Sequence, residues 1–201
     1  MQNDKAKLVV LTFLVVLATF MFTPATLALA TSETSGIYLT AADYRDGRLA
    51  LEGDCGSKTH KLSLHDVLNN PYVDVTHESE KRRYPKSDLF GFRACDGRDY
   101  RFASNFEYQI LESREMFIYA RGIPVNYGKG YRTIQEYYFS VGPEGHILAL
   151  TLENLKQALP NNHRFHDSLD ATFGPGREPW EYDEFHRMFK VNRLLIASRE
   201  P

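Results

Sequence analysis

Two patterns of apolar and polar residues divide the chain. From about residue 36 to 151, short runs rich in Tyr, Phe, Ile, Leu and Val alternate with Gly, Pro, Asn and Asp. Short apolar runs between turn residues are typical of β-strands, and the lack of long helical connections favours an antiparallel sheet or a partly closed barrel. The expected strands are 36–39, 48–52, 60–64, 72–77, 89–94, 98–102, 106–111, 116–121, 136–141 and 146–150.

One hairpin can be assigned in register from LFGFRACDGRDYRF, residues 89–102. A two-residue turn at 96–97 would divide the aromatic side chains between the two faces of the hairpin. A three-residue loop at 95–97, with its glycine in the left-handed conformation, places them on one face, so we predict this register. The predicted cross-strand pairs are Ala94 with Arg98, Phe92 with Tyr100, Phe90 with Phe102 and Arg93 with Asp99.

Three segments between the strands are rich in glycine, proline or charge. Residues 142–145, GPEG, are expected to turn the strand 136–141 back on 146–150. Residues 122–133, GIPVNYGKGYRT, are expected to interrupt the strands as a loop. Residues 78–86, ESEKRRYPK, could bind an anion, but their glutamates dilute the positive charge, and a charged loop between two strands is the preferred interpretation.

The pattern becomes helical after Thr151, whose hydroxyl is suited to cap a helix over 152–159 that ends at Pro160. A second helix is expected to begin near Asn162. A third is indicated by Pro179 at a first-turn position, followed by the apolar residues Tyr182, Phe185, Met188 and Phe189. The predicted fold is therefore α+β, with an antiparallel sheet or partly closed barrel followed by two or three C-terminal helices.

Residues 1–30 have the features of an export signal. Two lysines precede an apolar run of about fifteen residues, and small residues follow up to Ala30. The run is shorter than the roughly twenty residues that span a bilayer as a helix, which favours cleavage, with an uncleaved membrane anchor as the alternative. We therefore expect a periplasmic or extracellular protein of one domain, residues 31–201, with a sheet over about 36–151 and helices over about 152–196.

Charge and cysteine content narrow the functional classes. Removing residues 1–30 takes away two lysines and one aspartate, so the net charge changes from −2 to −3. A nucleic-acid partner is not expected, because binding phosphate backbones needs clustered Lys and Arg. Cys55 and Cys95 are predicted to form a disulfide, which persists in an oxidising compartment and would add about 4 kcal/mol of stability.

The segment NNHRFHDSLD, residues 161–170, carries two histidines on one helical face, His163 and His166. With a third ligand such as His186, they could hold zinc or another divalent ion. Polar residues on this face are also what an amphipathic helix requires opposite Phe165 and Leu169. The solvated helix face is the preferred interpretation.

Tyrosines concentrate in and after the segment 122–133. Aromatic side chains on loops of a rigid sheet are a common means of binding sugars, peptides or lipids. The candidate binding residues are Tyr127, Tyr131, Tyr137 and Tyr138. The alternative is that the strand tyrosines simply cover the sheet.

Three stretches, GIYLTAADY (36–44), YPKSDLFGFRACDGRDYRF (84–102) and LTLENLKQALPNNHRFHDSLD (150–170), follow the predicted signal peptide. In this order they resemble a group of small secreted bacterial proteins of unknown activity. The resemblance implies export from a bacterial cell and carries no catalytic residues.

The sequence lacks the serine-hydrolase elbow, the zinc-protease helix motif, the phosphate-binding loop and the dinucleotide-binding glycine motif in a strand–helix context. We expect a non-enzymatic extracytoplasmic binding or envelope-associated module without a cofactor, which uses the aromatic surface. Its partner would be a small molecule, a glycan or a protein, with membrane contact only through an uncleaved signal segment. The alternative is a metal-dependent hydrolase built on His163, His166 and His186.

Overall fold

The computed structural model describes residues 34–65 and 69–199, which all belong to one compact unit, Ser32–Pro201. The predicted signal peptide, residues 1–30, lies outside the described residues. In the part of the chain that the structure describes, no helix is long and apolar enough to cross a membrane.

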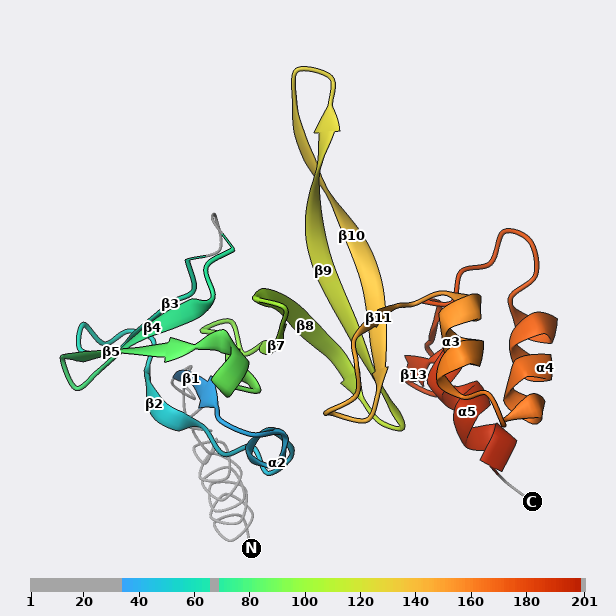
Figure 1. Cartoon of the computed structure of the whole chain (residues 1–201), viewed down its shortest axis with the longest axis horizontal. Helices are drawn as coiled ribbons and strands as arrows, with labels where there is room; N and C mark the ends of the chain where they lie inside the picture. Colours follow the sequence, from blue (N-terminus) through green and yellow to red (C-terminus); the bar gives the residue numbers. More distant parts are fainter. Residues whose placement is uncertain (1–33, 66–68, 200–201) are drawn as a thin grey trace, which may run out of the picture. The chain divides into compact units, whose positions relative to one another are not determined.

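Strands are the main secondary structure of this unit, and three of its helices lie near the C-terminus (Figure 1). The strands are β1 (Thr34–Tyr38), β2 (Ala50–Asp54), β3 (Lys61–Ser63), β4 (Tyr72–His77), β5 (Glu80–Pro85), β6 (Gly91–Arg93), β7 (Asp99–Ala103), β8 (Phe106–Ser113), β9 (Met116–Tyr127), β10 (Gly130–Val141), β11 (Leu148–Ala149), β12 (Tyr182–Asp183) and β13 (Met188–Phe189). The helices are α2 (Ala41–Arg45), α3 (Leu152–Ala158), α4 (His163–Thr172), α5 (Lys190–Arg199) and the 3-10 helix η2 (Lys86–Asp88).

Eight strands form one antiparallel sheet in the order β11-β10-β9-β8-β7-β6-β1-β2. Strands β11 and β2 are its two edges, so the sheet is open. The structure agrees with the antiparallel α+β class, and of the two predicted forms it has the sheet, which does not close into a barrel. Two smaller sheets accompany it, β3-β4-β5 and β12-β13.

The predicted register of the hairpin at 89–102 is confirmed, but Phe90 packs in a different hydrophobic cluster from Phe92 and Phe102, so the four aromatic side chains do not form one face. Phe92 pairs with Tyr100 and Arg93 with Asp99, and Gly97 has a φ of 78° in the three-residue loop. The rings of Phe92 and Tyr100 stack with their centroids 4.8 Å apart. This loop places Cys95 beside Cys55, and the predicted disulfide is present, with the two Cα atoms 5.7 Å apart.

The first two predicted helices are confirmed together with their caps. The Thr151 hydroxyl accepts a hydrogen bond from the backbone N–H of Asn154 at the start of α3. The Asn162 side chain accepts one from the N–H of Phe165 in α4. Phe165 and Leu169 are fully buried, as the helical spacing predicts.

The third predicted helix is wrong in position. Tyr182–Asp183 instead pairs with Met188–Phe189 as the β12–β13 hairpin. The Asp183 carboxylate accepts the backbone N–H of His186 at 3.0 Å, and such a side-chain turn competes with helix formation for the same backbone groups. The third helix, α5, begins only at Lys190.

Two predicted loops are strands. Residues 122–133 continue β9 and β10, which pair without a break from Met116 with Val141 to Tyr127 with Gly130. The glycines of this segment make a tight turn, in which Gly128 has a φ of 61°. Likewise, most of 78–86 is β5, because Glu78 and Ser79 make the turn that pairs it with β4. The turn 142–145 does bring β10 back on β11, with Phe139 opposite Leu148.

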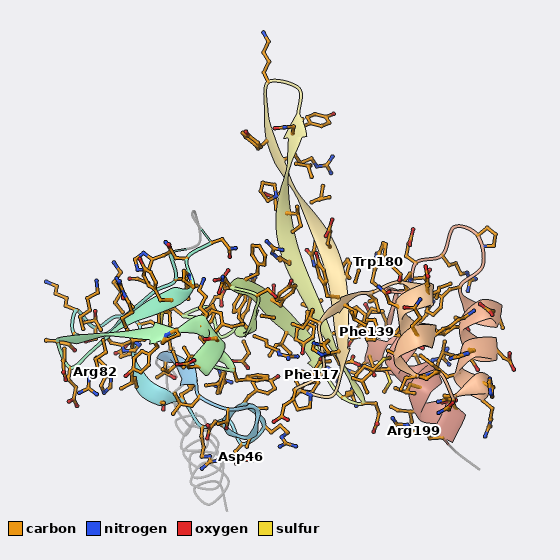
Figure 2. The ribbon with its side chains drawn as sticks, viewed as in Figure 1. Asp46, Arg82, Phe117, Phe139, Trp180 and Arg199 are labelled. Carbon is orange, nitrogen blue, oxygen red and sulfur yellow. A yellow bond between two sulfur atoms is a disulfide. The ribbon has the colours of Figure 1, made fainter. Side chains whose placement is uncertain are left out.

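Side chains alternate between the two faces of β9 and β10, and each face has its own core (Figure 2). The face that includes Phe139 packs against the C-terminal helices. We call this group the helix-side core: Met116, Ile118, Phe139, Leu150, Leu155, Phe165, Leu169, Phe173, Phe189, Val191 and Leu195. The face that includes Phe117 forms the tyrosine core: Tyr38, Ala41, Phe90, Tyr108, Phe117 and Tyr119, with Tyr44 and Tyr138 packed against it.

Candidate functional site

Polar side chains lie on the tyrosine-core face of four adjacent strands. Arg101 in β7 stands opposite Tyr108 in β8, and Tyr119 in β9 stands opposite Tyr138 in β10. Ser140 follows two positions after Tyr138 and therefore points to the same face. This alternation places a cation and several hydroxyl groups together on one face.

Arg101 is the centre of a buried hydrogen-bond network. Its guanidinium donates to the Tyr119 hydroxyl at 2.9 Å and to the Ser140 hydroxyl at 3.2 Å, and to the Gly145 carbonyl at 2.9 Å. Ser140 in turn donates to the Gly142 carbonyl at 2.7 Å. These hydrogen bonds hold the connection between β10 and β11 against the sheet.

The hydroxyl groups of this network remain neutral. Burial raises the pKa of Tyr119, while the nearby Arg101 charge lowers it by a smaller amount. Tyr119 and Ser140 are both fully buried. Among the described residues, Arg101 has no carboxylate partner, because its hydrogen bonds all end on neutral oxygens. A half-buried positive charge is therefore held in place without a counter-charge.

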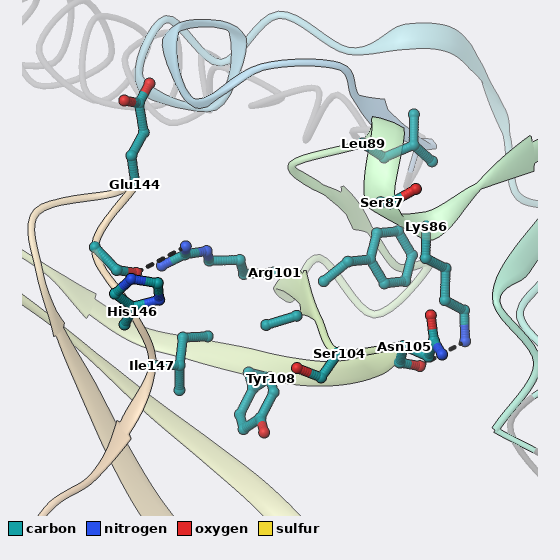
Figure 3. Close-up of a pocket in the computed structure, with 13 residues that line it drawn as sticks. Lys86, Ser87, Leu89, Arg101, Ser104, Asn105, Tyr108, Glu144, His146 and Ile147 are labelled. Carbon is teal, nitrogen blue, oxygen red and sulfur yellow. Dashed lines mark hydrogen bonds between the residues drawn. The ribbon is translucent and has the colours of Figure 1, made fainter.

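A cleft of about 430 Å³ opens beside this guanidinium (Figure 3). Its lining is mainly polar, and Figure 3 shows the Glu144 carboxylate turned away from Arg101 at the rim. The lining residues are Lys86, Ser87, Leu89, Arg101, Phe102, Ala103, Ser104, Asn105, Tyr108, Glu144, Gly145, His146 and Ile147.

Lys86 provides a second cation at this cleft, but it has a partner. Its side chain is 1 % exposed and forms an ion pair with Glu107. The ammonium group also donates to the Asn105 carbonyl at 3.1 Å. Lys86 is thus neutralised within the protein, and Arg101 is the cation of the cleft that has no carboxylate partner among the described residues.

The four predicted tyrosines do not form one cluster. The register of β9 and β10 places Tyr127 and Tyr138 on one face of the hairpin, and Tyr131 and Tyr137 on the other. Tyr127 and Tyr131 are 71 % and 80 % exposed. Tyr137 stacks on Trp180 with a centroid distance of 5.4 Å.

A hydrogen bond of its hydroxyl group distinguishes Tyr138 from the other three tyrosines. Its ring contacts that of Tyr108 edge to face. Its hydroxyl donates to Glu136 at 2.6 Å. Burial and the neighbouring Glu136 carboxylate raise the pKa of Tyr138 to about 12.

The predicted histidines are placed as follows. His163 and His166 lie in α4, with ring centroids 6.0 Å apart, and His166 Nε2 bonds with the Leu159 carbonyl. His186 lies in the β12–β13 turn, where its Nδ1 is 2.9 Å from the Asp183 carboxylate. Among residues 34–65 and 69–199, no three His, Cys, Asp or Glu side chains are grouped so that they could hold a metal ion. The three-histidine site stays a prediction.

A serine and a histidine meet near the disulfide, where no site was predicted. The Ser35 hydroxyl lies 2.9 Å from His60 Nε2, and both side chains are buried. A nucleophile–base pair would need a group that orients the other ring nitrogen, but His60 Nδ1 has no hydrogen-bond partner. The ring packs on Gly53, where a Cβ atom would come within 2.2 Å of it. We interpret this pair as part of the packing.

Comparison with known proteins found no matching family model, curated protein or solved structure. The Arg101 cleft was not found by the sequence analysis. The available signal is a polar residue between two apolar ones within a strand, as at Arg101 between Tyr100 and Phe102, and at Ser140 between Phe139 and Val141. On a sheet covered on both faces, such positions indicate polar groups that are buried and must be bonded.

Proposed function

We propose that the chain is an exported, non-enzymatic binding protein that holds a small organic anion in the Arg101 cleft. The observation that carries this proposal is the half-buried Arg101 guanidinium, which is fixed by three neutral acceptors and has no carboxylate partner among the described residues. Buried charges are normally paired, and a guanidinium binds carboxylate and phosphate groups through short, charge-assisted hydrogen bonds.

The geometry is suited to binding without rearrangement. Tyr119, Ser140 and the Gly145 carbonyl hold the side chain in place, so little conformational entropy is lost when an anion binds. These bonds use only part of the N–H groups of the guanidinium. The cleft volume of about 430 Å³ lies within the range of small-molecule sites, about 300–1,000 Å³.

The proposed location of the protein is an oxidising compartment outside the cytoplasm. The Cys55–Cys95 disulfide is compatible with an oxidising environment, and the first thirty residues have the composition of an export signal.

The test compares two arginines of the same hairpin. Arg101→Gln removes the cleft charge, whereas Arg98→Gln removes an exposed charge paired with Asp96 and changes the net charge equally. Citrate, phosphate and sulfate are titrated at constant ionic strength by calorimetry. We expect at least one anion to bind the unmodified chain and Arg98→Gln, and to bind Arg101→Gln at least about tenfold more weakly, because one charged hydrogen-bond donor is lost.

A second variant separates loss of charge from loss of fold. Arg101→Lys keeps a cation but loses the planar fork, so its affinity should lie between those of the unmodified chain and Arg101→Gln. Melting temperatures report whether each variant is folded. Equal anion affinity in Arg101→Gln and Arg98→Gln, or no binding of any of the three anions, contradicts the proposal.

A further inference from the structure

The distal half of the β9–β10 hairpin has no neighbour in the sheet. Pairing of β8 with β9 ends at Ala120, and β11 pairs with β10 only at Tyr138 and Phe139. Among the described residues, the segments 122–127 and 130–135 therefore pair only with each other. We call these two segments and their turn the arm. An isolated two-stranded hairpin is marginally stable in water, so a surface that covers one face would stabilise it.

The two faces of the arm differ in polarity. Cross-strand partners share a face, and Ile123 is opposite Ile134 while Val125 is opposite Arg132. The first face thus carries Ile123, Val125, Tyr127, Arg132 and Ile134, and the second carries Pro124, Asn126, Tyr131, Thr133 and Gln135. Ile134 is 36 % exposed and Tyr127 is 71 % exposed. The arm is an amphipathic hairpin whose apolar face is accessible to solvent.

All charged side chains of the arm are positive. Residues 122–135 contain Lys129 in the turn and Arg132 on the apolar face, and they contain no Asp or Glu. Within the described part of the chain, neither cation forms an ion pair. The rest of the protein is mildly acidic, because the whole chain has a formal net charge of −2. Positive charge and exposed apolar area thus coincide on the arm.

We propose that the arm docks on an anionic lipid surface, with the Ile123–Ile134 face against the lipid and Lys129 at the headgroups. Amphipathic segments bind membranes through apolar area together with attraction between Lys or Arg and anionic lipids, and tyrosine rings are suited to the interface. A second copy of the chain fits less well, because pairing two arms would bring Lys129 and Arg132 of each near those of the other. The inference is independent of the Arg101 cleft.

The test uses neighbouring residues on opposite faces of the arm. Ile134→Glu places a negative charge on the apolar face, and Gln135→Glu places the same charge on the polar face with almost the same side-chain size. Cosedimentation is measured with vesicles of phosphatidylglycerol and phosphatidylcholine in equal parts. Vesicles of phosphatidylcholine alone give the background, including any contribution from the N-terminal segment. Both variants are made in the full chain, so this background is shared.

We expect the unmodified chain to bind the anionic vesicles more tightly than the neutral ones, and the difference to decrease as salt is raised. Ile134→Glu should weaken binding by at least about tenfold, and Gln135→Glu by about fivefold or less, which is the effect of one unit of charge at the surface. A Lys129→Gln/Arg132→Gln double variant should remove most of the preference for anionic vesicles without altering the apolar face. Melting temperatures establish that the variants are folded.

Four outcomes overturn the inference. The first is equal binding to anionic and neutral vesicles. The second is equal loss in Ile134→Glu and Gln135→Glu. The third is a concentration-dependent dimer in sedimentation that Ile134→Glu dissociates, which would assign the face to a second copy. Arg101→Gln should bind vesicles normally, so loss of binding in that variant, with Ile134→Glu unaffected, would assign the lipid to the cleft instead.

Discussion

Phe139 and Ser140 are neighbours in β10, both fully buried, and they serve opposite faces of the sheet. Phe139 packs in the helix-side core, where burial of apolar area is favourable by itself. Ser140 lies in the Arg101 network, where burial costs free energy unless every polar group is bonded. Both faces bury apolar side chains, but the tyrosine-core face also holds a polar network whose groups must be hydrogen-bonded.

The largest expected effect comes from the helix-side core. Phe139→Ala should lower the free energy of unfolding by about 3–5 kcal/mol, because it removes a fully buried ring and leaves a cavity between the sheet and the helices. Urea unfolding followed by circular dichroism measures this change. A loss below about 1 kcal/mol would show that the helices do not depend on the sheet for packing.

A single substitution in the polar network of the tyrosine-core face should lower the stability less. Ser140→Ala removes bonds with Arg101, the Tyr119 hydroxyl and the Gly142 carbonyl, but Arg101 keeps Tyr119 and Gly145 as acceptors. The expected loss of stability is about 1–2 kcal/mol, with weaker anion binding because the guanidinium is less well fixed. Unfolding and calorimetry on the same variant test both effects. A loss as large as that of Phe139→Ala would contradict the contrast between the faces.

The smallest expected effect is a pH dependence of the tyrosine core. The pKa of Tyr138 is raised from 10.0 to about 12, so its contribution to stability is complete below pH 10 and is lost as pH rises from 10 toward 12. Unfolding free energies at several pH values in this window measure the slope. Tyr138→Phe should lose less stability across the window than the unmodified chain does. An unchanged slope would show that Tyr138 does not ionise more easily in the unfolded state.

Local patterns predicted a large part of the fold. Thr151 and Asn162 cap their helices because capping depends only on residues within one turn. The register of the hairpin at 89–102 was predictable because only one loop length places Phe92 opposite Tyr100. The Cys55–Cys95 disulfide followed from there being two cysteines and a predicted oxidising compartment.

The incorrect secondary-structure predictions lie in segments whose turn-forming residues are compatible with more than one structure. The glycines of 122–133 indicated a loop, but a two-residue hairpin turn needs glycine as well, and the strands continue on both sides of it. In the segment 182–189, apolar spacing fitted a helix. The Asp183 side chain closes a turn there instead, and His186 is consequently not on a helix.

The amino-acid sequence by itself determined the strand-rich first part, the first two C-terminal helices with their caps, and the pairing of the cysteines, because these depend on nearby residues or on simple counting. Only the tertiary structure decided which side chains from distant strands meet. Arg101, Tyr119 and Ser140 form one network because sheet order and register place them on the same face. The same register divided the four tyrosines between two faces and made 122–135 an amphipathic arm. In a sheet, a shift of one residue exchanges the faces, so non-local pairing decides what a polar residue can contact.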